Sequence, residues 1–268
     1  MVKQADLIIA ECPQDREDLI QHYNANPNKI AIVPCGFSAK EFYPIGKKLA
    51  RKKVNLDPDD KIILQLGRMV PRKGVDNVIR SLSKLKATGT SVKLVVVGGE
   101  SEDPTIPTPE IERLKTIATE EGVLDSVIFT GRKNRDVLKY YYNAADIFVT
   151  TPWYEPFGIT PLEAMACGTP VIGANVGGIK HTVVDGETGF LVPPNNPYAL
   201  AHKIHELLEN PALMYSMKEK AIQRVNTQFT WAQVASQLSL IYQRIFVAPK
   251  KTAPVLSTLE TKSKSEAA

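Results

Sequence analysis

The sequence predicts an α/β protein with a doubly wound, parallel, Rossmann-like sheet and a helical C-terminus. Three observations support this fold class. Short aliphatic runs without strict polar–apolar alternation recur as far as Val192, as in strands that are buried on both faces of a parallel sheet. Amphipathic segments with helical periodicity lie between most of these runs, which is the pattern of βαβ units. After Val192 the pattern is wholly helical.

Each element follows from this pattern. Strands are expected at the aliphatic runs, which are Ala5–Ala10, Ile30–Val33, Ile62–Leu66, Val92–Val97, Val127–Thr130, Ile147–Thr150, Pro170–Gly173 and Phe190–Val192. Helices are expected at Pro13–Tyr23, Val75–Leu85, Glu110–Ala118, Val137–Ala144, Leu162–Cys167, Pro197–Glu209, Pro211–Val225 and Trp231–Phe246. Ligands of such sheets bind at the carboxyl ends of the strands, so the loops there are the candidate site.

Composition narrows the function classes. The chain has 268 residues and a formal charge of +4, and it lacks the arginine-rich or aromatic-interleaved basic runs of nucleic-acid-binding proteins. No apolar run is long enough to span a bilayer, and the first residues do not resemble a signal peptide. Three widely spaced cysteines indicate a reducing, cytoplasmic compartment. His202 and His205 lie on one predicted helix without a nearby third metal ligand, so we expect no metal site.

The first candidate loop is Gly67–Gly74, between a predicted strand and a predicted helix. Arg68 leaves the strand and Lys73 stands at the start of the helix. Two cations beside the free N–H groups of a helix N-terminus suit a phosphate. The alternative is that both are solvated surface residues, but a lysine at a helix N-terminus is electrostatically unfavourable, which favours a functional role. The loop lacks the Gly-Lys-Ser/Thr of a Walker motif.

The second candidate loop follows the strand Ile147–Thr150. Glu155 lies in this loop, and Glu163 lies in the helix behind it. Carboxylates accept sugar hydroxyls, and Gly158 lets a ligand approach the N–H groups of Gly158, Ile159 and Thr160. For Glu163 the spacing equally fits a capping box with Thr160, with a proline at the first helical position. Glu155 has no obvious structural task.

These segments, in their order, resemble the glycosyltransferase group 1 family. The segment Glu155–Glu163 resembles its Glu-x7-Glu signature, and Gly67–Gly74 resembles its arginine–lysine diphosphate loop. Val95–Gly99, Ile128–Gly131 and Asp185–Val192 resemble its later motifs, and the likeness runs from about Ala5 to Phe246. Some stretches resemble the sucrose-phosphate synthase branch. The resemblance implies the two-domain GT-B fold, in which this chain corresponds to the C-terminal, donor-binding half.

The resemblance also implies roles for single residues. Arg68 and Lys73 would bind the diphosphate of a UDP-, GDP- or ADP-sugar and stabilise its charge as the glycosidic bond breaks. Glu155 would contact the transferred sugar and Glu163 the ribose. The remaining substrate-binding residues would be Gly158, Ile159 and Thr160 at the phosphates, Arg132 and Lys133 near the base, and Gly98 in the glycine turn. Family members retain the anomeric configuration, usually without a metal or another cofactor.

The resemblance divides the chain into four parts. Residues 1–44 are expected to be a remnant of the acceptor domain with its linker, and 45–229 the nucleotide-sugar-binding domain. Residues 230–247 are expected to form a crossover helix, and 248–268 a disordered tail. Most of the acceptor domain would then belong to a missing N-terminal segment or a partner chain.

Three other functions remain open at this point. The chain could be a sugar-nucleotide-binding module or subunit that is inactive alone. A dinucleotide-dependent oxidoreductase would need a Gly-x-Gly-x-x-Gly turn after the first strand, which is not found. An isomerase related to nucleotide-sugar epimerases fits the arginine–lysine loop less well. Fold alone does not decide between these functions.

Overall fold

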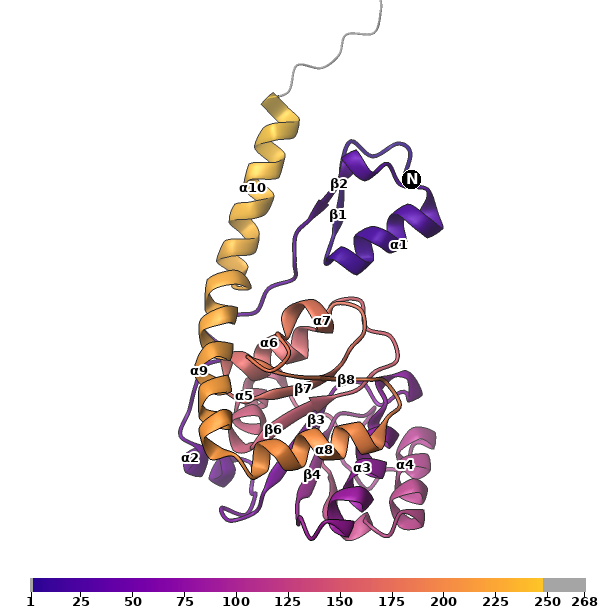
Figure 1. Cartoon of the computed structure of the whole chain (residues 1–268), viewed down its shortest axis with the longest axis vertical. Coiled ribbons are helices and arrows are strands. Elements are labelled where there is room, and N and C mark those ends of the chain that lie inside the picture. The colour runs from indigo at the N-terminus through magenta and orange to yellow at the C-terminus, as the bar shows by residue number, and fades with distance from the viewer. Residues whose placement is uncertain (1, 248–268) are drawn as a thin grey trace, which may run out of the picture.

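The computed structural model describes residues 2–247, which contain a large and a small parallel sheet (Figure 1). The large sheet has six strands in the order β5-β4-β3-β6-β7-β8, and the small sheet pairs β1 with β2. The strands are β1 (Ile8–Ala10), β2 (Ile30–Ile32), β3 (Ile62–Leu66), β4 (Lys93–Val97), β5 (Val127–Phe129), β6 (Ile147–Thr150), β7 (Val171–Ala174) and β8 (Gly189–Val192). The predicted doubly wound sheet is therefore confirmed.

Helices follow most of the strands and occupy the whole C-terminal part of the described chain. They are α1 (Pro13–Tyr23), α2 (Lys47–Lys53), α3 (Val75–Ala87), α4 (Pro109–Glu120), α5 (Arg135–Ala144), α6 (Ile159–Ala166), α7 (Ile179–Thr182), α8 (Pro197–Leu208), α9 (Pro211–Gln228) and α10 (Trp231–Val247). Four of them begin at proline, behind a side chain that accepts a hydrogen bond from an amide of the first turn; these caps are Cys12, Thr108, Asn196 and Asn210.

The large sheet has a hydrophobic core on each face. Alternate residues of β3 point to opposite sides, so Leu64 packs on the α5–α6 side and Ile63 on the side of α3, α4 and α8. All five residues of β3 are buried, which explains why its sequence shows no alternation of polar and apolar residues. The two layers of helices leave only the ends of the strands open to ligands.

The direction of the crossovers reverses in the middle of the large sheet. From β3 the chain moves outward through β4 to β5, and it then returns to place β6 on the other side of β3. The register pairs Ile63 with Ile147 and Leu64 with Phe148. In doubly wound sheets ligands bind at this switch point, beyond the carboxyl ends of the strands. The loops after β3 and β6 are the two candidate loops chosen from the sequence.

The small sheet and α1 form the βαβ unit that the sequence predicts. Three consecutive residue pairs join β1 to β2, from Ile8–Ile30 to Ala10–Ile32. The returning chain connects this unit to the rest of the molecule, because Phe37 pairs with the junction between α9 and α10. The amide of Phe37 donates to Phe229 at 2.9 Å, and the amide of Trp231 donates to Phe37 at 3.2 Å. The α10 helix then rises alongside the unit (Figure 1).

The apolar side chains of α10 are unevenly covered. Val234 is buried, whereas Leu240, Tyr242 and Phe246 are more than half exposed. The expected disordered tail, 248–268, lies outside the described residues.

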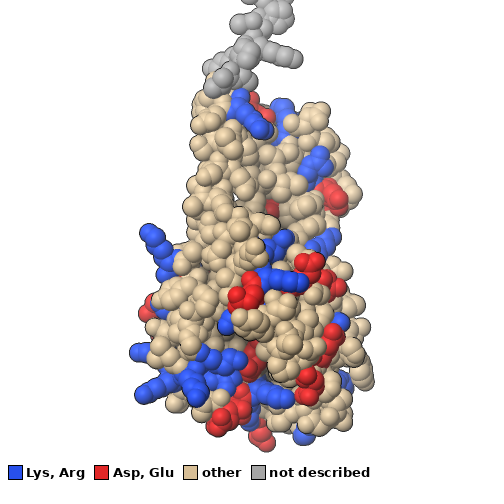
Figure 2. All heavy atoms as spheres, turned by 60° about the vertical axis from the view of Figure 1, so that its left-hand side comes forward, with Lys and Arg blue, Asp and Glu red and all other residues tan. Residues whose placement is uncertain are grey.

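One segment differs from its expectation. No helix was expected in the polar and basic stretch Gly46–Lys53, but its residues Lys47–Lys53 form α2, which packs on α5. The helix exposes Lys47, Lys48, Lys52 and Lys53, and lysine and arginine side chains gather at its position low on the face in Figure 2. In the part of the chain that the structure describes, no helix is long and apolar enough to cross a bilayer.

A buried arginine holds α2 to the sheet. Arg51 is 3% exposed, and its guanidinium donates to the carbonyl of Ala144 at 3.0 Å and pairs with Asp146 at 3.0 Å. Asp146 also accepts from the amide of Ile62, at the start of β3, at 2.7 Å. Arg51 thus binds α5 and the turn before β6, and Asp146 in turn binds the start of β3.

We expect Arg51→Ala to lower the free energy of unfolding by about 3 kcal/mol, because the Asp146 carboxylate loses its buried cationic partner and the carbonyl of Ala144 loses its donor. Urea denaturation measures this effect. The control is Lys52→Ala on the same helix, which should stay within about 0.5 kcal/mol of the parent because Lys52 is exposed. Equal stability of the two variants would contradict this account of α2.

Candidate functional site

The loops after β3 and β6 lie against each other at the switch point. The side chain of Trp153 donates to the carbonyl of Pro71 at 3.0 Å, and its amide donates to Arg72 at 3.2 Å. The hydroxyl of Thr151 donates to the carbonyl of Gly74 at 3.1 Å. A Cβ at Gly74 would lie 2.1 Å from the Thr151 carbonyl oxygen, so only glycine allows this approach. The two candidate loops thus form one structural unit.

Charged side chains join these loops directly. Lys73 forms an ion pair with Glu155, and Arg72 lies 3.9 Å from the same carboxylate oxygen. Arg72 also donates to the carbonyl of Tyr154 at 2.9 Å. Arg68 stands on the same loop with its side chain exposed. The structure therefore brings Glu155 and Lys73 together, and it adds Arg72, which the sequence analysis did not select although it lies inside the quoted loop.

Backbone amides open toward this group of charges from the start of α6. Gly158 caps the helix with φ 91°, in the left-handed region, and α6 begins at Ile159. The first N–H groups of a helix have no intrahelical acceptor, so those of Ile159 and Thr160 are free to meet a ligand. Ile159 is 39% exposed, an apolar side chain on the rim of the site.

Two glycines after β7 support the Glu155 loop from behind. Gly178 donates its amide to the carbonyl of Glu155 at 3.2 Å. A Cβ at Gly177 would lie 1.8 Å from that carbonyl oxygen, and one at Gly178 would lie 2.3 Å from the carbonyl oxygen of Phe157. The sequence analysis missed this pair, although Gly-Gly in the loop after a predicted strand was a visible signal.

Glu163 lies deeper than the other charged groups. Its side chain is 4% exposed, accepts a hydrogen bond from the hydroxyl of Tyr142 at 2.9 Å, and pairs with Arg135 at 3.1 Å. Burial raises the pKa of its carboxyl, while the contacts with Tyr142 and Arg135 offset part of the rise. The capping box with Thr160 is wrong, because Gly158 caps a helix that begins earlier and Glu163 lies in its second turn.

A third group of loops lies on the β4–β5 side of the sheet. Gly98 donates its amide to the carbonyl of Gly131 at 3.1 Å, and a Cβ at Gly98 would lie 1.9 Å from the carbonyl oxygen of Gly67. Arg132 donates its amide to Ser101 at 2.7 Å, while its guanidinium is exposed. Lys133 follows, half-buried. Gly98 thus connects the Arg132 loop to the loop that bears Arg68.

The small unit reaches the same site. The thiol of Cys12 lies 3.5 Å from the carbonyl of Pro156, and Lys180 donates to the side chain of Gln14 at 2.8 Å. These contacts place the start of α1 beside the residue that follows Glu155. The site therefore has loops of the large sheet on one side and the end of β1 on the other.

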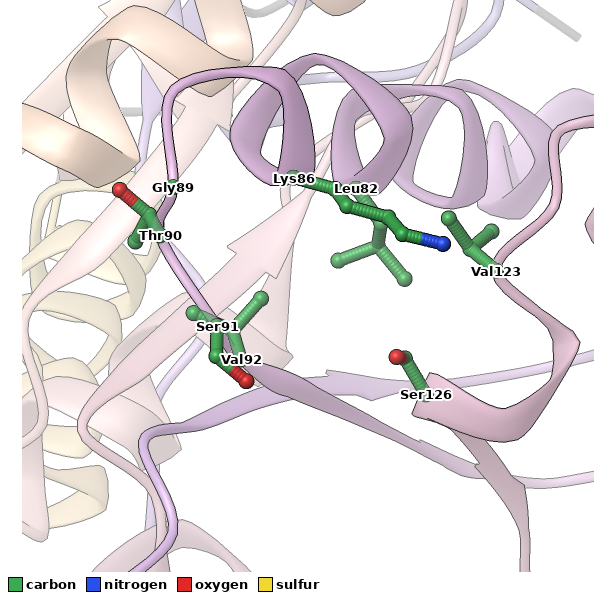
Figure 3. A pocket seen from close by; sticks show the side chains of 8 residues that line it. All are labelled: Leu82, Lys86, Gly89, Thr90, Ser91, Val92, Val123 and Ser126. Carbon is green, nitrogen blue, oxygen red and sulfur yellow. The ribbon is translucent and has the colours of Figure 1, made fainter.

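A pocket at the opposite edge of the sheet has different chemistry (Figure 3). It lies where β4 and β5 begin, between α3 and the turn at Val123, and Leu82, Val92 and Val123 line it with Lys86. The amine of Lys86 already donates to the carbonyl of Gly122 at 2.9 Å. Since ligands of doubly wound sheets bind at the carboxyl ends, the switch-point loops remain the candidate site.

Comparison with known proteins agrees with this geometry. The chain is similar to the D-inositol 3-phosphate glycosyltransferase of Streptomyces bingchenggensis, with 34% identity over 247 residues that cover 90% of this chain and 53% of that protein. It is also similar to the structure of sucrose-phosphate synthase from Thermosynechococcus elongatus, with 35% identity, a TM-score of 0.82, and coverage of 92% of this chain and 60% of the other.

A third similarity concerns the fold alone. The structure of Anabaena HepE in complex with UDP and glucose has a TM-score of 0.79 and 22% identity, over 89% of this chain and 63% of that one. The chain spans about half the length of the curated relatives it matches. The model of the family "Glycosyl transferases group 1" matches residues 46–224. This match covers every loop of the candidate site except the contact from α1, and the chain therefore belongs to the group 1 glycosyltransferases.

Proposed function

We propose that this chain binds the nucleotide-sugar donor of a transferase that retains the anomeric configuration of the transferred sugar. One observation supports this most strongly: Lys73 pairs with Glu155 at the switch point, beside the free amides at the start of α6 and on the same loop as the exposed Arg68. Cations and amides suit a diphosphate, and a carboxylate beside them suits the hydroxyls of the sugar attached to it.

The cations also suit the chemistry of transfer. When the bond between sugar and diphosphate breaks, negative charge grows on the leaving diphosphate. Arg68 and Lys73, together with the N-terminus of α6, stabilise that charge in the transition state more than in the bound donor. Glu155 accepts hydroxyls of the sugar while its ion pair with Lys73 fixes its position. Because the diphosphate is a good leaving group, we do not assign Glu155 as a nucleophile.

The remaining predicted residues would bind the nucleoside of the donor. Glu163 accepts the ribose hydroxyls through its buried carboxylate, and the Arg132–Lys133 loop lies beside the base, with Gly98 keeping the loops close. UDP is the first nucleotide to test, since HepE, which has this fold, is a complex with UDP. D-inositol 3-phosphate and other sugar phosphates are the first acceptors to test, given the names of the relatives.

The four-part division of the chain stays part of this proposal. Residues 45–229 hold the donor, while 1–44 and the 230–247 helix belong to the side of the cleft that faces it. This division is supported by the backbone hydrogen bond between Phe37 and Trp231, because the chain leaves the small unit near Phe37 and enters α10 at Trp231.

We expect Arg68→Ala to weaken UDP binding about tenfold to a hundredfold, which corresponds to the roughly 1.5–3 kcal/mol of a charge-assisted hydrogen bond. Isothermal titration calorimetry with UDP, GDP and ADP measures the effect. The control is Arg80→Ala on α3, whose ion pair with Glu121 lies away from the site loops. Unchanged affinity of Arg68→Ala for the nucleotide that the parent binds would refute the assignment.

We expect Glu163→Gln to weaken UDP binding at least tenfold, because an amide accepts ribose hydroxyls less strongly than a carboxylate. The melting temperature should change little, since Gln still accepts from Tyr142, and the lost ion pair with the exposed Arg135 is offset by removal of a buried charge. Calorimetry and thermal unfolding are measured on the same protein. A variant that loses stability but keeps its UDP affinity would show that Glu163 is structural.

We expect the 268-residue chain alone to bind donor but not to transfer its sugar at a useful rate. Transfer needs donor and acceptor in a near-attack arrangement with water excluded. In the described residues, the unit of β1, α1 and β2 forms the wall that faces the donor loops. Mass spectrometry of incubations with nucleotide sugars and sugar-phosphate acceptors provides the test. Multiple-turnover transfer by the chain alone would refute the expectation.

A further inference from the structure

Arg135, the first residue of α5, contacts three groups from different parts of the chain. Its guanidinium lies 3.1 Å from a carboxylate oxygen of Glu163 and 2.5 Å from Glu41, and it stacks 4.9 Å above the ring of Phe42. Its side chain is 55% exposed, whereas that of Glu163 is 4% exposed. The positively charged guanidinium of Arg135 thus lies over the buried carboxylate of Glu163. The sequence analysis assigned Arg135 no role.

The position of this arginine needs an explanation. A cation at a helix N-terminus faces the positive end of the helix dipole, which is unfavourable. The cap residue of α5, Asn134, makes no side-chain capping bond that would offset this cost. The two carboxylates and the ring of Phe42 supply the compensating contacts. Of the two carboxylates, Glu163 is the buried one, so solvent screens its pair with Arg135 less than it screens the pair with the exposed Glu41.

The surroundings of Glu163 contain few other charges. On α5, the hydroxyl of Tyr142 and the guanidinium of Arg135 contact Glu163. The buried thiol of Cys167, directly after α6, lies nearby, and Glu41 adds a second negative charge behind Arg135. Burial raises the pKa of Glu163, and Arg135 is the positive charge that lowers it. Without Arg135, the remaining charged neighbour in this set, Glu41, would disfavour the carboxylate.

We infer that Arg135 is a positioning residue, which keeps Glu163 ionised and aimed so that this carboxylate can receive the ribose. The inference rests on the proposed contact between Glu163 and the ribose. It does not require Arg135 to leave when nucleotide binds. The two oxygens of a carboxylate offer about four acceptor positions, and Tyr142 and Arg135 use two of them. Two positions remain for the 2′ and 3′ hydroxyls.

The test compares three substitutions of Arg135 by calorimetry across pH, with UDP and inorganic pyrophosphate as ligands. UDP affinity should be high where Glu163 is ionised and should fall as pH drops through its pKa. Removing the arginine raises that pKa further, so the acid limb of the Arg135→Ala profile should move to higher pH. A shift of one pH unit corresponds to about a tenfold loss of UDP affinity on that limb.

The other variants separate charge from structure. Arg135→Lys keeps the charge and should restore most of the parent profile, while Arg135→Gln keeps a donor without charge and should behave like Arg135→Ala. Pyrophosphate affinity should be unchanged in all three, because Arg135 acts through the ribose acid. The matched control is Arg113→Ala, which removes an arginine that pairs with two carboxylates in α3 and α4; neither ligand should be affected.

Two results would overturn the inference. An acid limb that coincides in the parent and Arg135→Gln would show that the charge does not act on Glu163. An equal loss of pyrophosphate affinity would make Arg135 a phosphate ligand instead. Glu163→Gln distinguishes this failure from that of the proposed function: if it keeps full UDP affinity, the ribose contact itself is wrong, whereas a weakened Glu163→Gln beside an unaffected Arg135→Gln refutes only the role of Arg135.

Discussion

The contact between the loops after β3 and β6 is the constraint on which the site depends. The reversal of the crossovers makes β3 and β6 neighbours, and glycine at position 74 lets the backbones of their loops touch. Only in that arrangement can Lys73 reach Glu155, although the two are distant in sequence. The fold thus produces the site through topology, and the glycines after β7 support the Glu155 loop from behind.

Most of the large sheet could be predicted because it is buried on both faces. Runs such as Ile62–Leu66 and Ile147–Thr150 appear in the structure with the predicted bounds, since a strand covered on both sides must be apolar throughout. The short edge strands were less well bounded: Ala5–Ala10 was predicted, and the strand begins at Ile8. An edge strand ends where its pairing ends, which its own sequence does not encode.

What the sequence could not predict depends on tertiary contacts. The stretch Lys47–Lys53 contains too many like charges to be recognised as a helix, and it forms one because buried Arg51 binds groups from distant segments. At Glu163, spacing alone left capping and binding equally open. The left-handed cap at Gly158 decided against capping by starting α6 earlier, and Tyr142 and Arg135 became the partners of Glu163.

Glu155 and Glu163 have different surroundings, which their spacing in the sequence does not reveal. Glu155 is partly exposed, and its charged partners are Lys73 and Arg72. In the proposed function these cations also contact the diphosphate, which would place Glu155 where charge changes during transfer. Glu163 is buried, where a charge is costly, and the structure meets that cost with one hydroxyl and one guanidinium. In the proposed function, the charged Glu163 carboxylate accepts hydrogen bonds from the ribose hydroxyls, and this binding offsets the cost of keeping a charge buried. The environment of each carboxylate, set by elements far away in sequence, therefore separates a residue suited to the reacting sugar from one suited to the nucleoside.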